Sequence, residues 1–86
     1  MKIKLYPPFD RLAQAELSLP LKHEQNVADV LNAITSQYPD LKEYINVDGD
    51  TYKPDIVILR AGRAVAPKES VCDTDVLDVF LPIMGG

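Results

Sequence analysis

The most distinctive chemical feature of the sequence is its ending, where Gly85 and Gly86 closely follow an apolar run at 76–81. Glycine has no Cβ, so its backbone can enter a slot too narrow for any other residue. Two glycines would let an enzyme thread the α-carboxylate toward a bound nucleotide. Because polar chain ends often fray, an incidental diglycine is the alternative. The ending predicts a carboxylate presented for chemistry, with Gly86 as the reacting residue.

The rest of the sequence offers no other reactive site. His23 is the only histidine and lies in a polar stretch, which indicates a surface position. No His, Cys, Asp and Glu residues have metal-ligand spacing, and the Asp-Gly-Asp at 48–50 lacks the later ligands of a calcium loop. Cys72 is followed by Asp73, and a neighbouring carboxylate disfavours the thiolate. We therefore expect no metal, no cofactor and no catalysis by the chain alone.

The composition indicates a small acidic domain. The 86 residues are enough for one domain, and the single cysteine cannot form an internal disulfide, which fits a reducing compartment. The net charge of −4 disfavours nucleic acid, which requires a basic patch, and fits either docking on a basic protein or plain solubility. No apolar run has the length of a membrane span or of a signal peptide. We therefore expect a cytoplasmic protein that contacts no membrane.

The hydrophobic pattern predicts two strands, one helix and three further strands. Polar and apolar residues alternate over 2–6 and again over 16–21, which predicts two antiparallel strands, each half-buried. Asn26 is a typical helix N-cap, and apolar residues at helical spacing follow it until Pro39 ends the helix.

After the helix, residues 46–54 are polar and rich in turn formers, which predicts a loop. The strand at 55–60 is the most apolar of the predicted strands and rich in β-branched residues, which predicts a central position buried on both faces. A turn at Gly62 then leads to a short strand over 64–66, and the last strand covers 76–81.

This order of elements predicts an α+β roll. The simplest fold with this order of elements is the ubiquitin-like β-grasp, which has a mixed four- to five-stranded sheet with one main helix packed across it. In this fold the first and last strands are parallel neighbours at the centre of the sheet. We expect residues 1–81 to form this domain. Residues 82–86 should be a flexible tail, since they have little to bury and ordering two glycines is costly.

The alternation of the last strand suggests a docking face. If Leu77, Val79 and Leu81 pack on the helix, Phe80 is left as an exposed aromatic beside the tail. Exposed aromatic residues often anchor interfaces. In the alternative arrangement, Phe80 packs in the core and Val79 faces outward. We assign to partner binding Phe80, Pro82 and Ile83, and to the threaded segment Met84 and Gly85.

The sequence resembles the MoaD/ThiS family of ubiquitin-like sulfur carriers over nearly its whole length. It is most like the MoaD type, the small subunits of molybdopterin synthases. The specific part is the ending at 75–86, and supporting segments are 2–6, 9–13, 27–31 and 38–44, the last reading Tyr-Pro-Asp-Leu-Lys-Glu-Tyr. Departures occur at Pro7-Pro8, Arg60-Ala61-Gly62, Thr74-Asp75 and Leu81-Pro82, which leaves the subfamily and the client pathway open.

The resemblance implies a cycle of activation and sulfur transfer. A ubiquitin-activating-like adenylyltransferase of the MoeB/ThiF type would adenylate the Gly86 carboxylate with ATP, and sulfur transfer would then give a thiocarboxylate. A large synthase subunit of the MoaE type would take up the charged tail, and the sulfur would build the dithiolene of molybdopterin. Cys72 should be dispensable in this cycle.

Three alternatives stay open. The chain resembles ThiS carriers, which supply sulfur for thiamine thiazole synthesis, although these are usually shorter. A protein modifier joined to lysines through Gly86 would begin with the same tail chemistry. A β-grasp interaction module with an incidental diglycine belongs to a different class.

Overall fold

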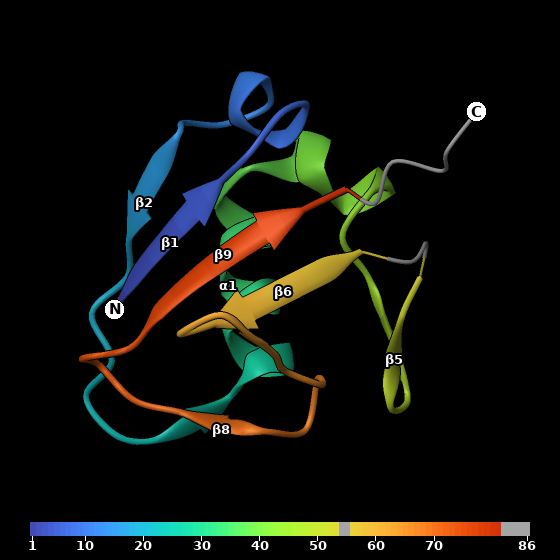
Figure 1. Cartoon of the computed structure of the whole chain (residues 1–86). Helices are drawn as coiled ribbons and strands as arrows, with labels where there is room; N and C mark the ends of the chain where they lie inside the picture. The colour runs from blue at the N-terminus through green and yellow to red at the C-terminus, as the bar shows by residue number, and fades with distance from the viewer. Residues whose placement is uncertain (54–55, 82–86) are drawn as a thin grey trace.

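The computed structural model describes residues 1–53 and 56–81, so the predictions for Gly85, Gly86 and the other tail residues lie outside the described part (Figure 1). One mixed sheet has the strand order β2-β1-β9-β6-β7. β1 and β9 are parallel neighbours, and the other pairs are antiparallel. The five strands are β1 (Lys2–Leu5), β2 (Glu16–Ser18), β6 (Val57–Arg60), β7 (Arg63–Ala64) and β9 (Val76–Phe80). The predicted β-grasp, ubiquitin-like fold is confirmed.

Helix α1 (Val27–Gln37) lies across one face of the sheet (Figure 1). Its N-cap is the predicted Asn26, whose side-chain oxygen accepts a 2.8 Å hydrogen bond from the backbone N–H of Asp29. The helix ends before Pro39, as predicted, and a short 3-10 helix η2 (Pro39–Glu43) follows. The apolar stripe of α1 is buried, through Val27, Val30, Leu31 and Ile34.

The core lies between α1 and the inward face of the sheet. Every second residue of the central strands points into it, namely Ile3 and Leu5 of β1, Leu77 and Val79 of β9 and Ile58 of β6. Phe9, from the 3-10 helix η1 (Phe9–Arg11), is also fully buried, and its ring meets that of Tyr44 edge-on, with centroids 6.2 Å apart.

Two short strand pairings occur outside the predicted strands. The expected loop after the helix contains a small hairpin of β4 (Val47–Asp48) and β5 (Thr51–Tyr52), and β3 (Gln25–Asn26) pairs with β8 (Ser70–Val71). The hydroxyl of Tyr52 donates a 2.6 Å hydrogen bond to the carbonyl oxygen of Val65. Burial, with a smaller effect of the Glu69 charge, raises the pKa of Tyr52 to about 12, so the hydroxyl stays a donor.

The prediction that the 55–60 strand is buried on both faces was wrong. The described strand is β6, and among its residues only Ile58 is buried, while Val57 and Leu59 are half-exposed. The reason is that α1 covers a single face of the sheet, and the opposite face, toward the viewer in Figure 1, has no described element over it. Two other strands are also shorter than predicted. β2 covers only the first part of the predicted 16–21 strand. β7 is shorter than the predicted 64–66 strand and begins one residue earlier.

The turn between β6 and β7 holds one residue in an unfavourable conformation. Arg60 and Arg63 are cross-strand partners, so two residues form the turn, and both have positive φ, 53° at Ala61 and 79° at Gly62. Such a turn favours Asn followed by Gly, because alanine is strained in the left-handed region.

We therefore predict that Ala61→Asn stabilises the protein by about 1 kcal/mol, measured by denaturant unfolding, because Asn tolerates the left-handed region that costs alanine about 1–2 kcal/mol. The matched change Gly62→Ala should destabilise it, since it adds a Cβ at positive φ, even though nothing lies within 4 Å of that Cβ. A loss of stability in Ala61→Asn would contradict this account of the turn.

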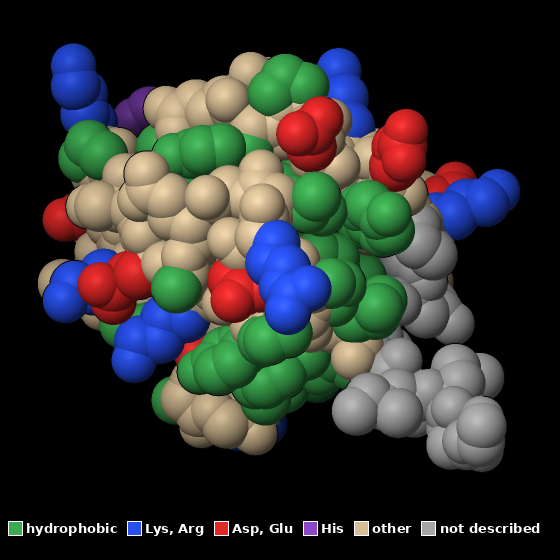
Figure 2. All heavy atoms as spheres, turned by 90° about the horizontal axis from the view of Figure 1, so that it is seen from above, with side chains coloured by type: hydrophobic (Ala, Val, Ile, Leu, Met, Phe, Trp, Pro, Cys, Tyr) green, Lys and Arg blue, Asp and Glu red, His purple; other side chains and the backbone are tan. Residues whose placement is uncertain are grey.

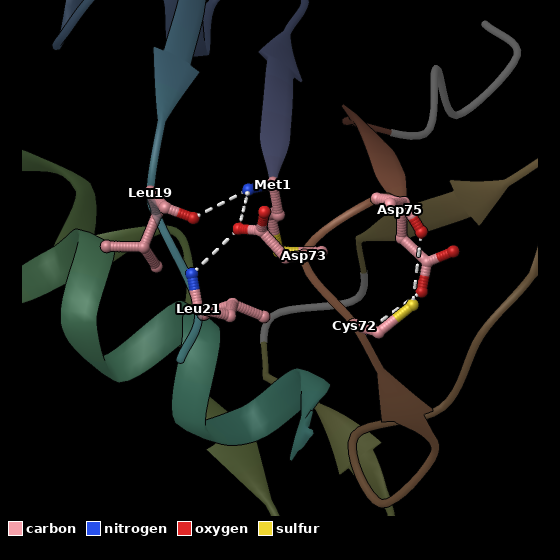
Figure 3. Close-up of polar contacts among 7 residues, drawn as sticks. Met1, Leu19, Leu21, Cys72, Asp73 and Asp75 are labelled. Atoms are coloured by element: carbon pink, nitrogen blue, oxygen red, sulfur yellow. Dashed lines mark hydrogen bonds and ion pairs between the residues drawn. The ribbon is translucent and has the colours of Figure 1, made fainter. Parts of the chain in front are cut away.

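A carboxylate joins the start of β1 to the turn before β9 (Figure 3). Oδ1 of Asp73 accepts hydrogen bonds from the Met1 ammonium at 2.9 Å and from the Leu21 backbone N–H at 2.8 Å. The same ammonium donates to the carbonyl oxygen of Leu19 at 2.8 Å. The N–H of Leu21, and then the Met1 ammonium, hold the pKa of Asp73 below its ordinary value. This contact ties together three segments that are distant in sequence.

Because the Asp73 pKa is lower in the folded state, its contribution is present above the unfolded pKa of about 4 and is lost as pH falls through the folded value. We predict that Asp73→Asn unfolds at a lower denaturant concentration than wild type at pH 7. The difference should shrink below about pH 4, as the wild-type carboxylate is protonated. A difference that stays constant from pH 7 to pH 3 would show that the charge contributes nothing.

Candidate functional site

Strand β9 leads the described chain toward the last residues and carries an aromatic side chain near its end. Phe80 lies on the outer face of the sheet, opposite the helix, and its ring stacks on Tyr6 with centroids 4.2 Å apart and planes 9° apart. The pairing of β1 with β9 sets this contact, because the N–H of Tyr6 donates to the carbonyl oxygen of Val79 at 3.1 Å. Both rings are half-buried.

Apolar side chains extend from this stack along the outer face. We define the outer apolar patch by five residues that are half-buried or, in one case, exposed: Tyr6, Val57, Leu59, Val76 and Phe80. Val57 is the cross-strand partner of Phe80, and Val76 is 37% exposed. Figure 2, which views the molecule from above, shows hydrophobic side chains gathered on part of the surface. Apolar side chains left partly exposed on one face of a sheet are a common feature of interaction sites.

One polar contact lies within the patch. The hydroxyl of Tyr6 donates a 3.1 Å hydrogen bond to Oδ1 of Asp78. This hydrogen bond raises the pKa of Tyr6, with smaller contributions from burial and from the Asp78 charge. The Tyr6 hydroxyl therefore stays protonated at neutral pH and keeps the ring in place over Phe80.

The structure places only one of the predicted site residues. Leu77 and Val79 are fully buried, so Phe80 points outward, but it is half-covered by Tyr6 instead of standing free. The other site residues lie outside the described part of the chain. Sequence reasoning missed Tyr6, although the alternation of β1 continues to it and the expected parallel pairing with the last strand would have placed it beside Phe80.

Among the described residues, the other candidate reactive side chains lie at the surface. Cys72 is exposed, and its Sγ lies 3.3 Å from the hydroxyl oxygen of Thr74. His23 is exposed as well. Within residues 1–53 and 56–81 there is no group of three potential metal ligands, and no helix is long and apolar enough to cross a membrane. The described arrangement is suited to binding a partner beside the end of β9.

Comparison with solved structures shows similar β-grasp proteins in archaea. The chain is 28% identical to small archaeal modifier protein 1 of Haloferax volcanii, with a TM-score of 0.85 over 100% of this chain and 98% of that one. It is 30% identical to a putative molybdopterin converting factor subunit 1 of Pyrococcus furiosus, with a TM-score of 0.80 over 95% of both chains. The modifier protein 1 of Methanosarcina acetivorans is 28% identical, with a TM-score of 0.75 over 99% of this chain and 94% of that one.

No curated protein matches the chain significantly. The model of the ThiS family, in contrast, matches residues 3–86, which is almost the entire chain. Together with the fold, this match identifies a small carrier of the ThiS, MoaD and archaeal-modifier type, which acts as a sulfur carrier or as a ubiquitin-like modifier and is not itself a catalyst. The chain belongs to the ThiS family.

Proposed function

We propose that this protein is the sulfur carrier of a molybdopterin-synthase-like complex, working through the carboxylate of Gly86. The observation that carries the proposal is the stacked pair of Tyr6 and Phe80 on the uncovered face of the sheet, at the end of the strand that precedes the diglycine. The 30% identity to the putative molybdopterin converting factor subunit 1 supports the choice of pathway.

In the proposed activation step, the Gly86 carboxylate attacks the α-phosphorus of ATP in a ubiquitin-activating-like enzyme. A bond forms from the carboxylate oxygen to phosphorus, the bond between the α-phosphorus and the bridging oxygen breaks, and pyrophosphate leaves. Hydrosulfide from a sulfur donor then attacks the acyl carbon of the adenylate, a carbon–sulfur bond forms, the bond from the acyl carbon to the AMP oxygen breaks, and AMP leaves. The tail then ends in a thiocarboxylate, with no change in the oxidation state of sulfur. Activation is needed because a carboxylate is a poor electrophile and AMP is a good leaving group.

The outer apolar patch is the proposed docking surface for the enzymes that act on the tail. Aromatic side chains contribute strongly to interfaces because they bury a large area with little loss of conformational freedom. We assign Phe80, Pro82 and Ile83 to partner binding, and Met84 and Gly85 to the segment threaded toward the nucleotide. We expect this cycle in the cytoplasm.

The direct test is the mass of the intact protein after incubation with ATP, the activating enzyme of the same organism and a sulfur donor. Replacement of one oxygen by sulfur, located at Gly86 by fragmentation, is the expected result. Mixing the product with a MoaE-type large subunit should then give a heteromer, while transfer only to a thiazole-forming enzyme would indicate the ThiS-like role. No change in mass with a competent activating enzyme would refute the carrier role.

A second candidate is a protein modifier, which the likeness to two archaeal modifier proteins favours. Its first step is the same adenylation, but the acyl group would pass to a lysine amine and form an isopeptide bond. The same incubation, with total cell protein added, distinguishes the two: a modifier gives a ladder of conjugates linked through Gly86, and a sulfur carrier gives none.

A further inference from the structure

The outer apolar patch has a carboxylate at its centre. Asp78 lies on β9 between Val76 and Phe80, and its cross-strand partner on β6 is Leu59. It is half-buried even before any partner covers it. Burying a charged group against apolar atoms is costly unless a hydrogen bond or an opposite charge compensates it. A partner that covers the patch therefore has to place a hydrogen-bond donor or a positive charge against this carboxylate.

The protein itself satisfies Asp78 only in part. Its Oδ1 accepts the hydrogen bond from Tyr6, and no other hydrogen bond or ion pair within the described residues involves the Asp78 side chain. Lys4 is its neighbour on β1, but Lys4 is exposed, is also paired in register with Glu16 on β2, and forms no ion pair with either. An exposed lysine of this kind does little to stabilise the charge of a neighbouring carboxylate. The second oxygen, Oδ2, has no hydrogen-bond or ion-pair partner among the described residues.

We propose that Asp78 determines which partners fit the docking surface, and that the activating enzyme places a guanidinium or ammonium group against its Oδ2. This inference rests on the proposed function. The charge complementarity agrees with the net charge of −4, which favours a basic partner surface. An enzyme with an apolar or acidic group at this point would bury an unpaired carboxylate, so Asp78 rejects such partners as well as attracting the correct one.

The experiment measures ATP–pyrophosphate exchange catalysed by the activating enzyme of the same organism, with the chain as the varied substrate, at several salt concentrations. Asp78→Asn keeps an oxygen that can accept from Tyr6 but removes the charge. We expect its KM to rise by about ten- to a hundredfold, with a weaker dependence on salt than wild type. The matched control is Glu16→Gln, which removes one charge on the same face two strands away and should leave both quantities unchanged.

The outcomes separate this inference from the proposed function. Absence of exchange with the wild-type chain and a competent enzyme overturns both. Exchange by wild type, with the same KM and salt dependence in a folded Asp78→Asn variant, overturns only the role of Asp78. Self-association of that variant in sedimentation, with an unchanged KM, also overturns it and shows that the charge serves to keep the apolar patches of two copies apart. Equal losses in Asp78→Asn and Glu16→Gln indicate general charge steering and overturn a specific contact.

Discussion

Removing Gly86 is expected to abolish activation of the chain while leaving its docking intact. A residue in an extended tail spans about 3.5 Å, so the carboxylate of the shortened chain stops that far from the α-phosphorus. Misplacement of a reacting group by about 1 Å costs about a hundredfold in rate, so pyrophosphate exchange should fall by at least this factor. Gly85→Ala should also lower the rate, because a Cβ would meet the walls of a slot shaped for glycine.

Competition provides the control for this prediction. Because the outer apolar patch is unchanged, the chain without Gly86 should inhibit exchange of the wild-type chain competitively, with an inhibition constant close to the wild-type KM. Its unfolding should match that of wild type. Exchange at the normal rate would show that Gly86 does not supply the reacting carboxylate, and loss of inhibition would show that the last residue also contributes to docking.

The fold could be predicted from the sequence because its main elements carry strong local signals. Asn26 and Pro39 mark the ends of the helix region, and the alternation in β1 and β9 identifies the two strands of the central pairing. The hairpin of β4 and β5 was missed because strands of two residues carry no periodicity. The position of Phe9 was missed for a related reason, since its burial depends on contacts such as that with Tyr44, made through the fold and not through a local pattern.

The candidate site was predictable only in part. Alternation along β9 is enough to place Phe80 on the face opposite Leu77 and Val79, but it cannot show which side chain lies next to Phe80. That depends on the register of the parallel pair, in which Leu5 is aligned with Val79 and Tyr6 comes next. The apolar character of the predicted 55–60 strand was attributed to burial on both faces, whereas Val57 and Leu59 belong to the outer apolar patch. A strand with an uncovered apolar face has the same composition as a fully buried one.

The stacking of Phe80 on Tyr6 makes the effects of Phe80→Ala on binding and on stability separable. If Phe80 anchors the partner, its loss should cost about 2 kcal/mol or more in docking, which raises the KM in pyrophosphate exchange by about thirtyfold or more. Val76→Ala is the comparison, because Val76 lies on the same strand and face but is not part of the stack. As a smaller member of the outer apolar patch, it should raise the KM by much less than Phe80→Ala.

Stability decides whether Phe80 belongs to the docking surface or to the core. Losing the stacked pair lowers the free energy of unfolding by about 0.5–1.5 kcal/mol, in addition to the effect of the lost apolar burial. Truncating a fully buried Phe lowers it by about 3–5 kcal/mol. Phe9 has 0% exposure, so Phe9→Ala serves as the reference for a fully buried Phe in the same protein. We therefore expect Phe80→Ala to unfold at a denaturant concentration between those of wild type and Phe9→Ala. A loss as large as that of Phe9→Ala, or an unchanged KM in the folded variant, would return Phe80 to a structural role and leave the outer face without its anchor.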